Sequence, residues 1–104
     1  MNNCCFTGYL VNNPDVYMVD KVLKADLVVV IYNYRKVRNS KDKSRTPVYL
    51  KCEAWHTGAE IIERFAVEGT KITFQATAKN VSKENTQMIF RINEFDLCHP
   101  EFED

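Results

Sequence analysis

Alternation of apolar and polar side chains with a period of two constrains this chain more than any other feature. In the segment from Thr46 to Trp55, the even-numbered positions from 48 onward are compact and apolar, whereas the odd-numbered ones are Tyr49, Lys51, Glu53 and Trp55. Successive side chains of a β-strand point to opposite faces, so the first set suits a barrel interior. The pattern therefore predicts a strand with two aromatic rings and a lysine on its outer face.

Similar runs rich in Val, Ile, Thr, Tyr and Phe recur along the chain and are typical of strands. They predict five strands, at Cys4–Val11, Leu23–Val37, Thr46–Trp55, Lys71–Lys79 and Gln87–Leu97. Segments rich in Asn, Asp, Ser and Lys at 12–15, 39–44 and 82–85 have turn-forming compositions. We therefore expect an all-β chain with long strands.

One segment, Thr57 to Gly69, departs from this pattern and predicts a short helix. Thr57 and Glu60 have the spacing of a capping box, Glu60 can pair with Arg64 one turn on, and Gly69 suits a left-handed residue past the helix end. A helical apolar stripe is formed by Ala59, Ile62 and Ala66. Three strands, a helix and two strands fit a five-stranded oligonucleotide-binding (OB) barrel better than a sandwich.

Length and composition indicate a single globular domain. The chain has 104 residues, of which 45% are hydrophobic, and no apolar run approaches the roughly 20 residues of a membrane span. We assign residues 1–98 to the OB domain and 99–104 to a short acidic C-terminal end. The N-terminus has neither the positive start nor the apolar stretch of a secretory signal, so we expect a reducing, cytoplasmic location and no membrane partner.

No catalytic or metal-binding pattern is apparent. Cys4 and Cys5 are adjacent, Cys52 and Cys98 lie within apolar alternation, and the histidines form no chelating unit with them. We find no glycine-rich phosphate loop, no paired carboxylates and no nucleophile–base pair at a supporting spacing. We therefore expect buried thiols, no metal, no cofactor and no enzymatic activity.

The net charge of zero conceals a separation of charge. Residues 35–45 contain six basic side chains and one acidic, whereas residues 94–104 contain five acidic side chains and no basic one. Tyr32 and Tyr34 precede the basic segment, which includes Arg35, Lys36 and Arg38. Aromatic rings among cations suit a groove that follows a phosphate backbone, although a basic hairpin can also be a solvated tip.

The outer aromatics Tyr49 and Trp55 have two interpretations. They could pack under a loop or in a subunit interface, or they could stack on unpaired bases, each worth roughly 1 to 3 kcal/mol regardless of base identity. Lys51, Lys79 and Lys83 could extend a phosphate-binding groove, although solvation explains such a polar face equally well. The residues from Leu27 to Ile31 are apolar on both strand faces, which favours a homo-oligomer with a subunit covering one of them.

Several blocks of residues resemble one family. Gly8-Tyr9-Leu10-Val11-Asn12-Asn13-Pro14, then Ala54-Trp55, Ala59-Glu60 and Glu68-Gly69-Thr70-Lys71-Ile72 are similar in order and spacing to motifs of bacterial and phage-type single-stranded DNA-binding proteins. Primosomal replication accessory proteins are short relatives within this group. The resemblance covers residues 2 to about 98 and implies an OB barrel that coats unpaired DNA.

The resemblance also implies roles for particular residues. Tyr49 and Trp55 match two stacking aromatics, and Tyr34 falls within one residue of another. Lys83 lies where the family carries a stacking aromatic, and Glu53 is unfavourable beside an anionic ligand. The family is usually tetrameric, which favours a tetramer here, although the primosomal relatives are dimers.

The end of the chain departs from the family, which commonly carries a long linker and an acidic tip that recruits replication and repair enzymes. Here residues 99–104 are acidic but follow no such linker.

Two functional hypotheses result. The first is a sequence-tolerant single-stranded DNA-binding protein of replication, recombination or repair. The alternative is a dimeric replication-restart accessory that acts mainly as a protein-interaction module, with replication or recombination proteins as partners. Preference for DNA over RNA stays open, because stacking does not read the 2′-hydroxyl.

Overall fold

A computed structural model describes residues 1–36 and 43–98, with side chains for all of them except 34–36 and 43–44. The elements are β1 (Cys4–Leu10), β2 (Asp15–Val19), β3 (Val22–Lys36), β4 (Lys43–Trp55), α1 (Thr57–Phe65), β5 (Lys71–Asn80) and β6 (Met88–Cys98). The prediction of an all-β fold with one short helix is confirmed. Arg38 and the acidic end at 99–104 lie outside the described residues.

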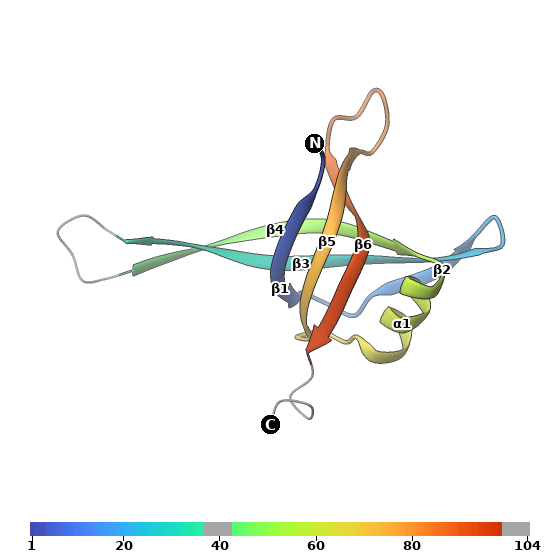
Figure 1. Cartoon of the computed structure of the whole chain (residues 1–104), viewed down its shortest axis with the longest axis horizontal. Helices are drawn as coiled ribbons and strands as arrows, with labels where there is room; N and C mark the ends of the chain where they lie inside the picture. The colour runs from blue at the N-terminus through green and yellow to red at the C-terminus, as the bar shows by residue number, and fades with distance from the viewer. Residues whose placement is uncertain (37–42, 99–104) are drawn as a thin grey trace.

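Five of the strands close into a barrel. Their order is β1-β5-β6-β4-β3, and a short antiparallel pairing of β1 with β3 completes the circle. The neighbours pair antiparallel except β4 and β6, which run parallel. In Figure 1 the long β3 and β4 cross behind β1, β5 and β6, and α1 lies beside one end of the barrel. This arrangement is the predicted five-stranded OB barrel.

The structure contains a sixth strand that the sequence did not predict. Asp15 was expected to end a turn, but it begins β2, which pairs with β3 from Asp15↔Asp26 to Val19↔Val22. The connecting residues Asp20 and Lys21 both have positive φ values, of 49° and 68°. They form a tight two-residue hairpin without glycine, so the usual sequence signal of such a turn is missing.

The interior follows the predicted alternation. Leu50, Cys52 and Ala54 of β4 are buried, and Val48 packs against the core from its edge. The buried residues of the other strands and of the helix continue this core: Leu10, Ala25, Leu27, Val29, Ala59, Ile62, Ala66, Ile72, Phe74, Ala76 and Ile92. The cysteine prediction holds only in part, because Cys52 is buried whereas Cys98 is half-buried and Cys5 is exposed.

The predicted capping of the helix was wrong. His56, not Thr57, occupies the N-cap, and no side chain caps the helix there. The helix ends at Phe65, and Ala66 is already extended, so Gly69 takes its positive φ of 88° three residues further on, in the turn before β5. Glu60 and Arg64, both described, form no ion pair. The burial predicted for Ala59, Ile62 and Ala66 is confirmed, although Ala66 lies just beyond the end of the helix.

Candidate nucleic-acid interface

Strand register places Tyr17, Lys24 and Trp55 in one row across the outer face of β2, β3 and β4. Lys24 lies at the centre of this row. Its Nζ is 5.6 Å from the Tyr17 ring centroid and 5.3 Å from the Trp55 ring centroid. The ammonium therefore makes a cation–π contact on each side. Trp55 is half-buried, and its Nε1 is buried with no hydrogen-bond partner among the described residues.

The next row contains Asp26, Glu53 and Arg91, from β3, β4 and β6. Glu53 faces outward as predicted, yet only 2% of it is exposed. Lys24 Nζ lies 3.3 Å from its Oε2, and Lys79 Nζ lies 2.5 Å from its Oε1. The carboxylate that we expected to oppose an anionic ligand is thus covered and neutralised by two lysines.

Lys24 is bound from three directions. It also approaches Asp26 Oδ1 at 3.2 Å and donates to the Tyr17 hydroxyl at 3.2 Å, and that hydroxyl in turn donates to Asp26. Burial opposes the charged form of Lys24, but its bonds to Tyr17, Asp26 and Glu53 outweigh this, so the pKa of Lys24 lies above its ordinary value. The hydrogen bond to Asp26 raises the pKa of Tyr17. Lys24 is therefore charged at every physiological pH.

A second aromatic group lies further along the same face. Tyr9, Val30 and Tyr49 form a row across β1, β3 and β4, with Tyr49 62% exposed and Tyr9 42% exposed. Tyr49 and Trp55 are separated by roughly 20 Å along β4, at about 3.4 Å per residue. Lys51, which is exposed, lies between them. The face thus carries aromatic rings at two places with cations between and beside them.

The outer face that carries Tyr9, Tyr17, Tyr49 and Trp55, here called the aromatic face, continues toward the projecting end of β3 and β4. Tyr32 is half-buried, and the guanidinium of Arg45 lies 3.9 Å from its ring centroid. Tyr34, Arg35 and Lys36 belong to β3, but their side chains are not described. Their predicted roles, with that of Arg38, fall outside what the structure describes.

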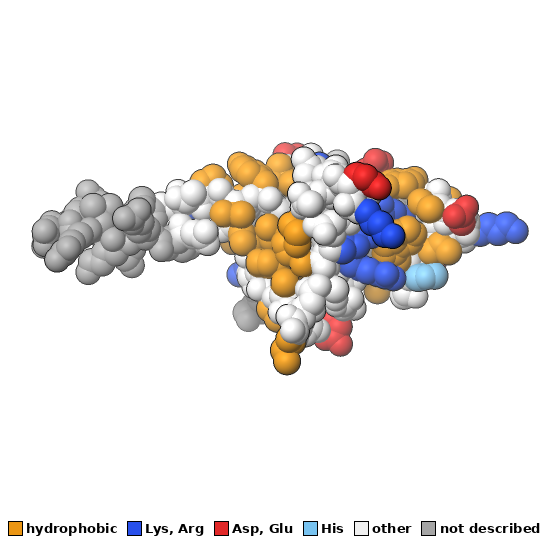
Figure 2. All heavy atoms as spheres, turned by 90° about the horizontal axis from the view of Figure 1, so that it is seen from above, with side chains coloured by type: hydrophobic (Ala, Val, Ile, Leu, Met, Phe, Trp, Pro, Cys, Tyr) orange, Lys and Arg blue, Asp and Glu red, His pale blue; other side chains and the backbone are white. Residues whose placement is uncertain are grey.

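The structure brings some of the predicted residues together and leaves others apart. Tyr49, Lys51 and Trp55 share one face of β4, and Lys79 joins them from β5 through Glu53. Lys83 is exposed on the separate loop between β5 and β6, which projects at the top of Figure 1. Viewed from above, Lys and Arg side chains gather next to hydrophobic ones (Figure 2).

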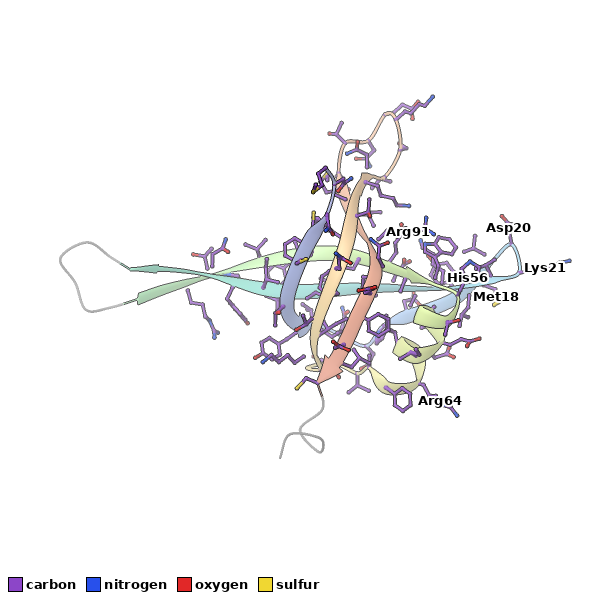
Figure 3. The ribbon with its side chains drawn as sticks, in the orientation of Figure 1. Met18, Asp20, Lys21, His56, Arg64 and Arg91 are labelled. Atoms are coloured by element: carbon purple, nitrogen blue, oxygen red, sulfur yellow. The ribbon has the colours of Figure 1, made fainter. Side chains whose placement is uncertain are left out.

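Sequence reasoning missed four residues of this face, Tyr9, Tyr17, Lys24 and Arg91, whereas Arg45 belongs to the basic segment 35–45 that it identified. Each of the four had an ordinary strand position, and only the pairing of β1, β2 and β6 with β3 and β4 shows that it belongs here. Arg91 is labelled beside β6 in Figure 3. Alternation could have placed Tyr9 and Lys24 on the outside of their strands, but not beside Tyr49 and Trp55.

An apolar groove lies between α1 and the β5–β6 pair. Its apolar walls include Ile61, Phe65 and Phe95, and Glu94 and Asp96 also line it. Phe65 is 50% exposed. Arg64 points away from the barrel at the lower edge of the helix (Figure 3). The groove is lined by other residues than the aromatic face.

Within residues 1–36 and 43–98, no three His, Cys, Asp or Glu side chains are grouped to hold a metal ion. In the same part of the chain, no helix has the length and apolar character to cross a membrane.

Comparison with known proteins finds similarity in structure alone. No protein-family model matches the chain, and no curated protein matches it in sequence. A deletion mutant of the single-stranded DNA-binding protein from Thermus aquaticus superposes with a TM-score of 0.81 at 16% identity, covering 96% of this chain and 51% of the other. The chain thus spans about half the length of that protein.

Two shorter structures match over nearly their whole length. The SSB domain of a Synechococcus protein has a TM-score of 0.70 at 15% identity, with 91% of this chain and 93% of the other covered. The protein PriB from Ralstonia solanacearum has a TM-score of 0.71 at 12% identity, with 94% and 99% covered. These likenesses establish that the chain shares its fold with the proteins that the sequence motifs resemble.

Proposed function

We propose that this protein binds single-stranded DNA without sequence preference and acts, without enzymatic activity, in replication, recombination or repair. The observation that carries the proposal is the outer face of β3 and β4, where Tyr49 and Trp55 flank Lys51 on an OB barrel. Stacking on a ring accepts any base, and cations beside the rings track the phosphates. Binding through this face is therefore tolerant of sequence.

The candidate residues have distinct roles in this proposal. Tyr49, with Tyr9 beside it, stacks on bases, and Trp55 provides a second stacking position. Tyr32 and Tyr34 extend the surface toward the basic segment of Arg35, Lys36 and Arg38. Lys51, Lys83 and Arg91 contact phosphates, whereas Lys79, which the sequence also suggested for this role, is paired with Glu53.

Titration with oligo-dT tests the proposal, since Trp55 is the only tryptophan. We expect its fluorescence to fall on binding, and log affinity to fall linearly with log salt concentration, because DNA binding releases condensed cations. Tyr49→Ala removes one stacking position and lowers affinity by roughly 1 to 3 kcal/mol. Phe65→Ala on α1 is the control and leaves affinity unchanged. The absence of both fluorescence quenching and a mobility shift at low salt would contradict the proposed function.

The proposal includes a homo-oligomer. Val28 is half-buried on the outer side of β3, and Phe6, Ile31 and Phe90 pack against the core but are themselves only partly buried. A second subunit would cover apolar surface of this kind. Solution mass distinguishes the assemblies, since four times 12.1 kDa supports the favoured tetramer and two times supports a dimer.

The groove beside α1 supports the alternative, a replication-restart accessory that acts mainly by binding proteins. Its apolar walls and its Glu94 and Asp96 fit a segment with apolar and basic side chains. The two variants above separate the hypotheses. If Tyr49→Ala weakens DNA binding and Phe65→Ala does not, the result supports the DNA-coating protein. If Phe65→Ala abolishes partner binding and keeps DNA binding intact, the result supports the accessory protein.

A further inference from the structure

Glu53 is an unusual residue for a surface that binds a polyanion. It lies at the centre of that surface, is 2% exposed, and has a lysine on each carboxylate oxygen. A buried carboxylate loses its hydration and is retained only where cations or donors replace the water. Lys24 and Lys79 are these replacements, one from β3 and one from β5.

The charges around Glu53 balance locally. Lys24 and Lys79 contribute two positive charges, and Glu53 and Asp26 contribute two negative ones within the ion-pair distances above. Arg91 is the register partner of Glu53 on β6, and Asp15 is that of Asp26 on β2. Neither Arg91 nor Lys51 forms an ion pair within the described part of the chain. The exposed cations are thus available to phosphates, whereas the two paired lysines are engaged.

We propose that Glu53 is a positioning residue of the DNA-binding face: it fixes Lys24 against Trp55 and withholds Lys24 and Lys79 from DNA phosphates. The inference rests on the proposed function. Its first part follows from geometry, since Lys24 bonds to Glu53 and contacts the Trp55 ring at the same time. Its second part follows from competition between a DNA phosphate and the Glu53 carboxylate for the same lysines. Among the described residues, Glu53 has no cation other than Lys24 and Lys79 within ion-pair distance, so losing them to a phosphate would leave a buried charge unpaired.

The two parts have opposite effects on binding. An ordered Trp55 presents its ring for stacking without further loss of side-chain freedom. Engaged lysines reduce the number of released counterions and so weaken the salt dependence. Glu53 therefore lowers the electrostatic part of the affinity for DNA and, at the same time, fixes the stacking geometry of Trp55.

The central experiment compares Glu53→Gln with Glu94→Gln in oligo-dT titrations over a range of salt concentrations. Both variants remove one negative charge, but Glu94 is exposed on β6 and has no ion pair among the described residues. We expect Glu53→Gln to steepen the slope of log affinity against log salt by about 0.7 for each lysine released, or about fivefold tighter binding per lysine at 0.1 M salt. Glu94→Gln leaves the slope unchanged.

A second pair of variants keeps the test decisive if Glu53→Gln does not fold. Lys79→Gln replaces a half-exposed side chain, and Lys51→Gln replaces an exposed one on the same face. We expect Lys51→Gln to reduce the slope by about 0.7 and Lys79→Gln to leave it nearly unchanged, because only Lys51 contacts a phosphate at equilibrium. Equal losses in the two variants would overturn the withholding of Lys79.

The positioning of Trp55 is tested without DNA. Acrylamide quenching of Trp55 fluorescence should increase in Glu53→Gln, where Lys24 is no longer fixed, and stay unchanged in Glu94→Gln. Equal quenching in both variants would overturn the positioning role. If the wild-type protein bound no oligo-dT, the proposed function would fail while this measurement still decided whether Glu53 orders Trp55.

Discussion

At the scale of single residues, His56 is held in a backbone conformation that suits glycine. Its φ of 58° and ψ of −127° join β4 to α1, and its backbone nitrogen donates to the Leu23 carbonyl at 3.0 Å. A side chain in such a region costs about 1 to 3 kcal/mol. Figure 3 shows His56 near Met18 at the end of the β2–β3 hairpin, and both line a small hollow there.

We therefore predict that His56→Gly stabilises the protein by about 1 kcal/mol, after the greater freedom of glycine in the unfolded chain is subtracted. Thermal unfolding measures the change, which corresponds to an increase in Tm of about 4 °C or more. Thr57→Gly is the control, since Thr57 is the first residue of α1 and the substitution should lower Tm. A fall in both variants would mean that the conformation at His56 carries no strain.

Cys52 and Cys5 should differ in reactivity, because burial raises the pKa of the Cys52 thiol to about 12. At pH 8 we expect a disulfide reagent such as DTNB to modify the exposed Cys5 quickly and Cys52 only after unfolding. A variant with Cys4, Cys5 and Cys98 all changed to Ser isolates the slow reaction of Cys52, because the other two thiols are only half-buried. In the unfolded chain Cys52 ionises near pH 9, so its contribution to stability is present below that pH and is lost as the pH rises toward 12.

At the scale of elements, barrel closure depends on Gly8. A Cβ at this position would lie 2.3 Å from the Val30 carbonyl oxygen and 2.8 Å from Val29 Cγ1. This contact adjoins the short pairing of β1 with β3, Tyr9↔Val30 and Leu10↔Val29. Only glycine lets the two backbones approach so closely.

We predict that Gly8→Ala destabilises the protein by about 1 to 3 kcal/mol or more, because the strands must separate to admit the methyl group. Chemical denaturation monitored by circular dichroism measures the loss. Gly58→Ala is a matched control, since its Cβ would meet the nearest atom at an ordinary 3.5 Å. Equal stability of Gly8→Ala and the wild type would show that the closure tolerates separation.

The elements show why sequence reasoning succeeded for the core and failed for part of the face. Alternation identifies inward positions such as Leu50 and Ala54, because burial acts on each strand separately. The short β2 is defined by its register with β3 and by a hairpin without glycine, neither of which leaves a local signal. The pairing of Lys24 and Lys79 with Glu53 likewise depends on which strands become neighbours.

At the scale of the whole molecule, the net charge of zero is the sum of a basic segment at 35–45, an acidic segment at 94–104 and locally balanced ion pairs. The cations of β3 and β5 nearest the aromatic face are offset by Asp26 and Glu53. In the proposed function, attraction for DNA therefore depends mainly on Lys51, Lys83, Arg91 and the basic segment 35–45. We expect the acidic residues of segment 94–104 to oppose that attraction, because their negative charges compete with those of DNA for the same cations.

We accordingly predict that removing residues 100–104 tightens binding to oligo-dT at low salt. The deletion removes Glu101, Glu103 and Asp104 and changes the net charge from zero to plus three. A chain of full length with these residues changed to Gln, Gln and Asn should show the same gain, which separates charge from length. Because salt screens the interaction, the difference should disappear as the salt concentration approaches 1 M, where the Debye length is about 3 Å. Affinities that match the wild type at 0.01 M salt would show that the acidic end does not compete with DNA.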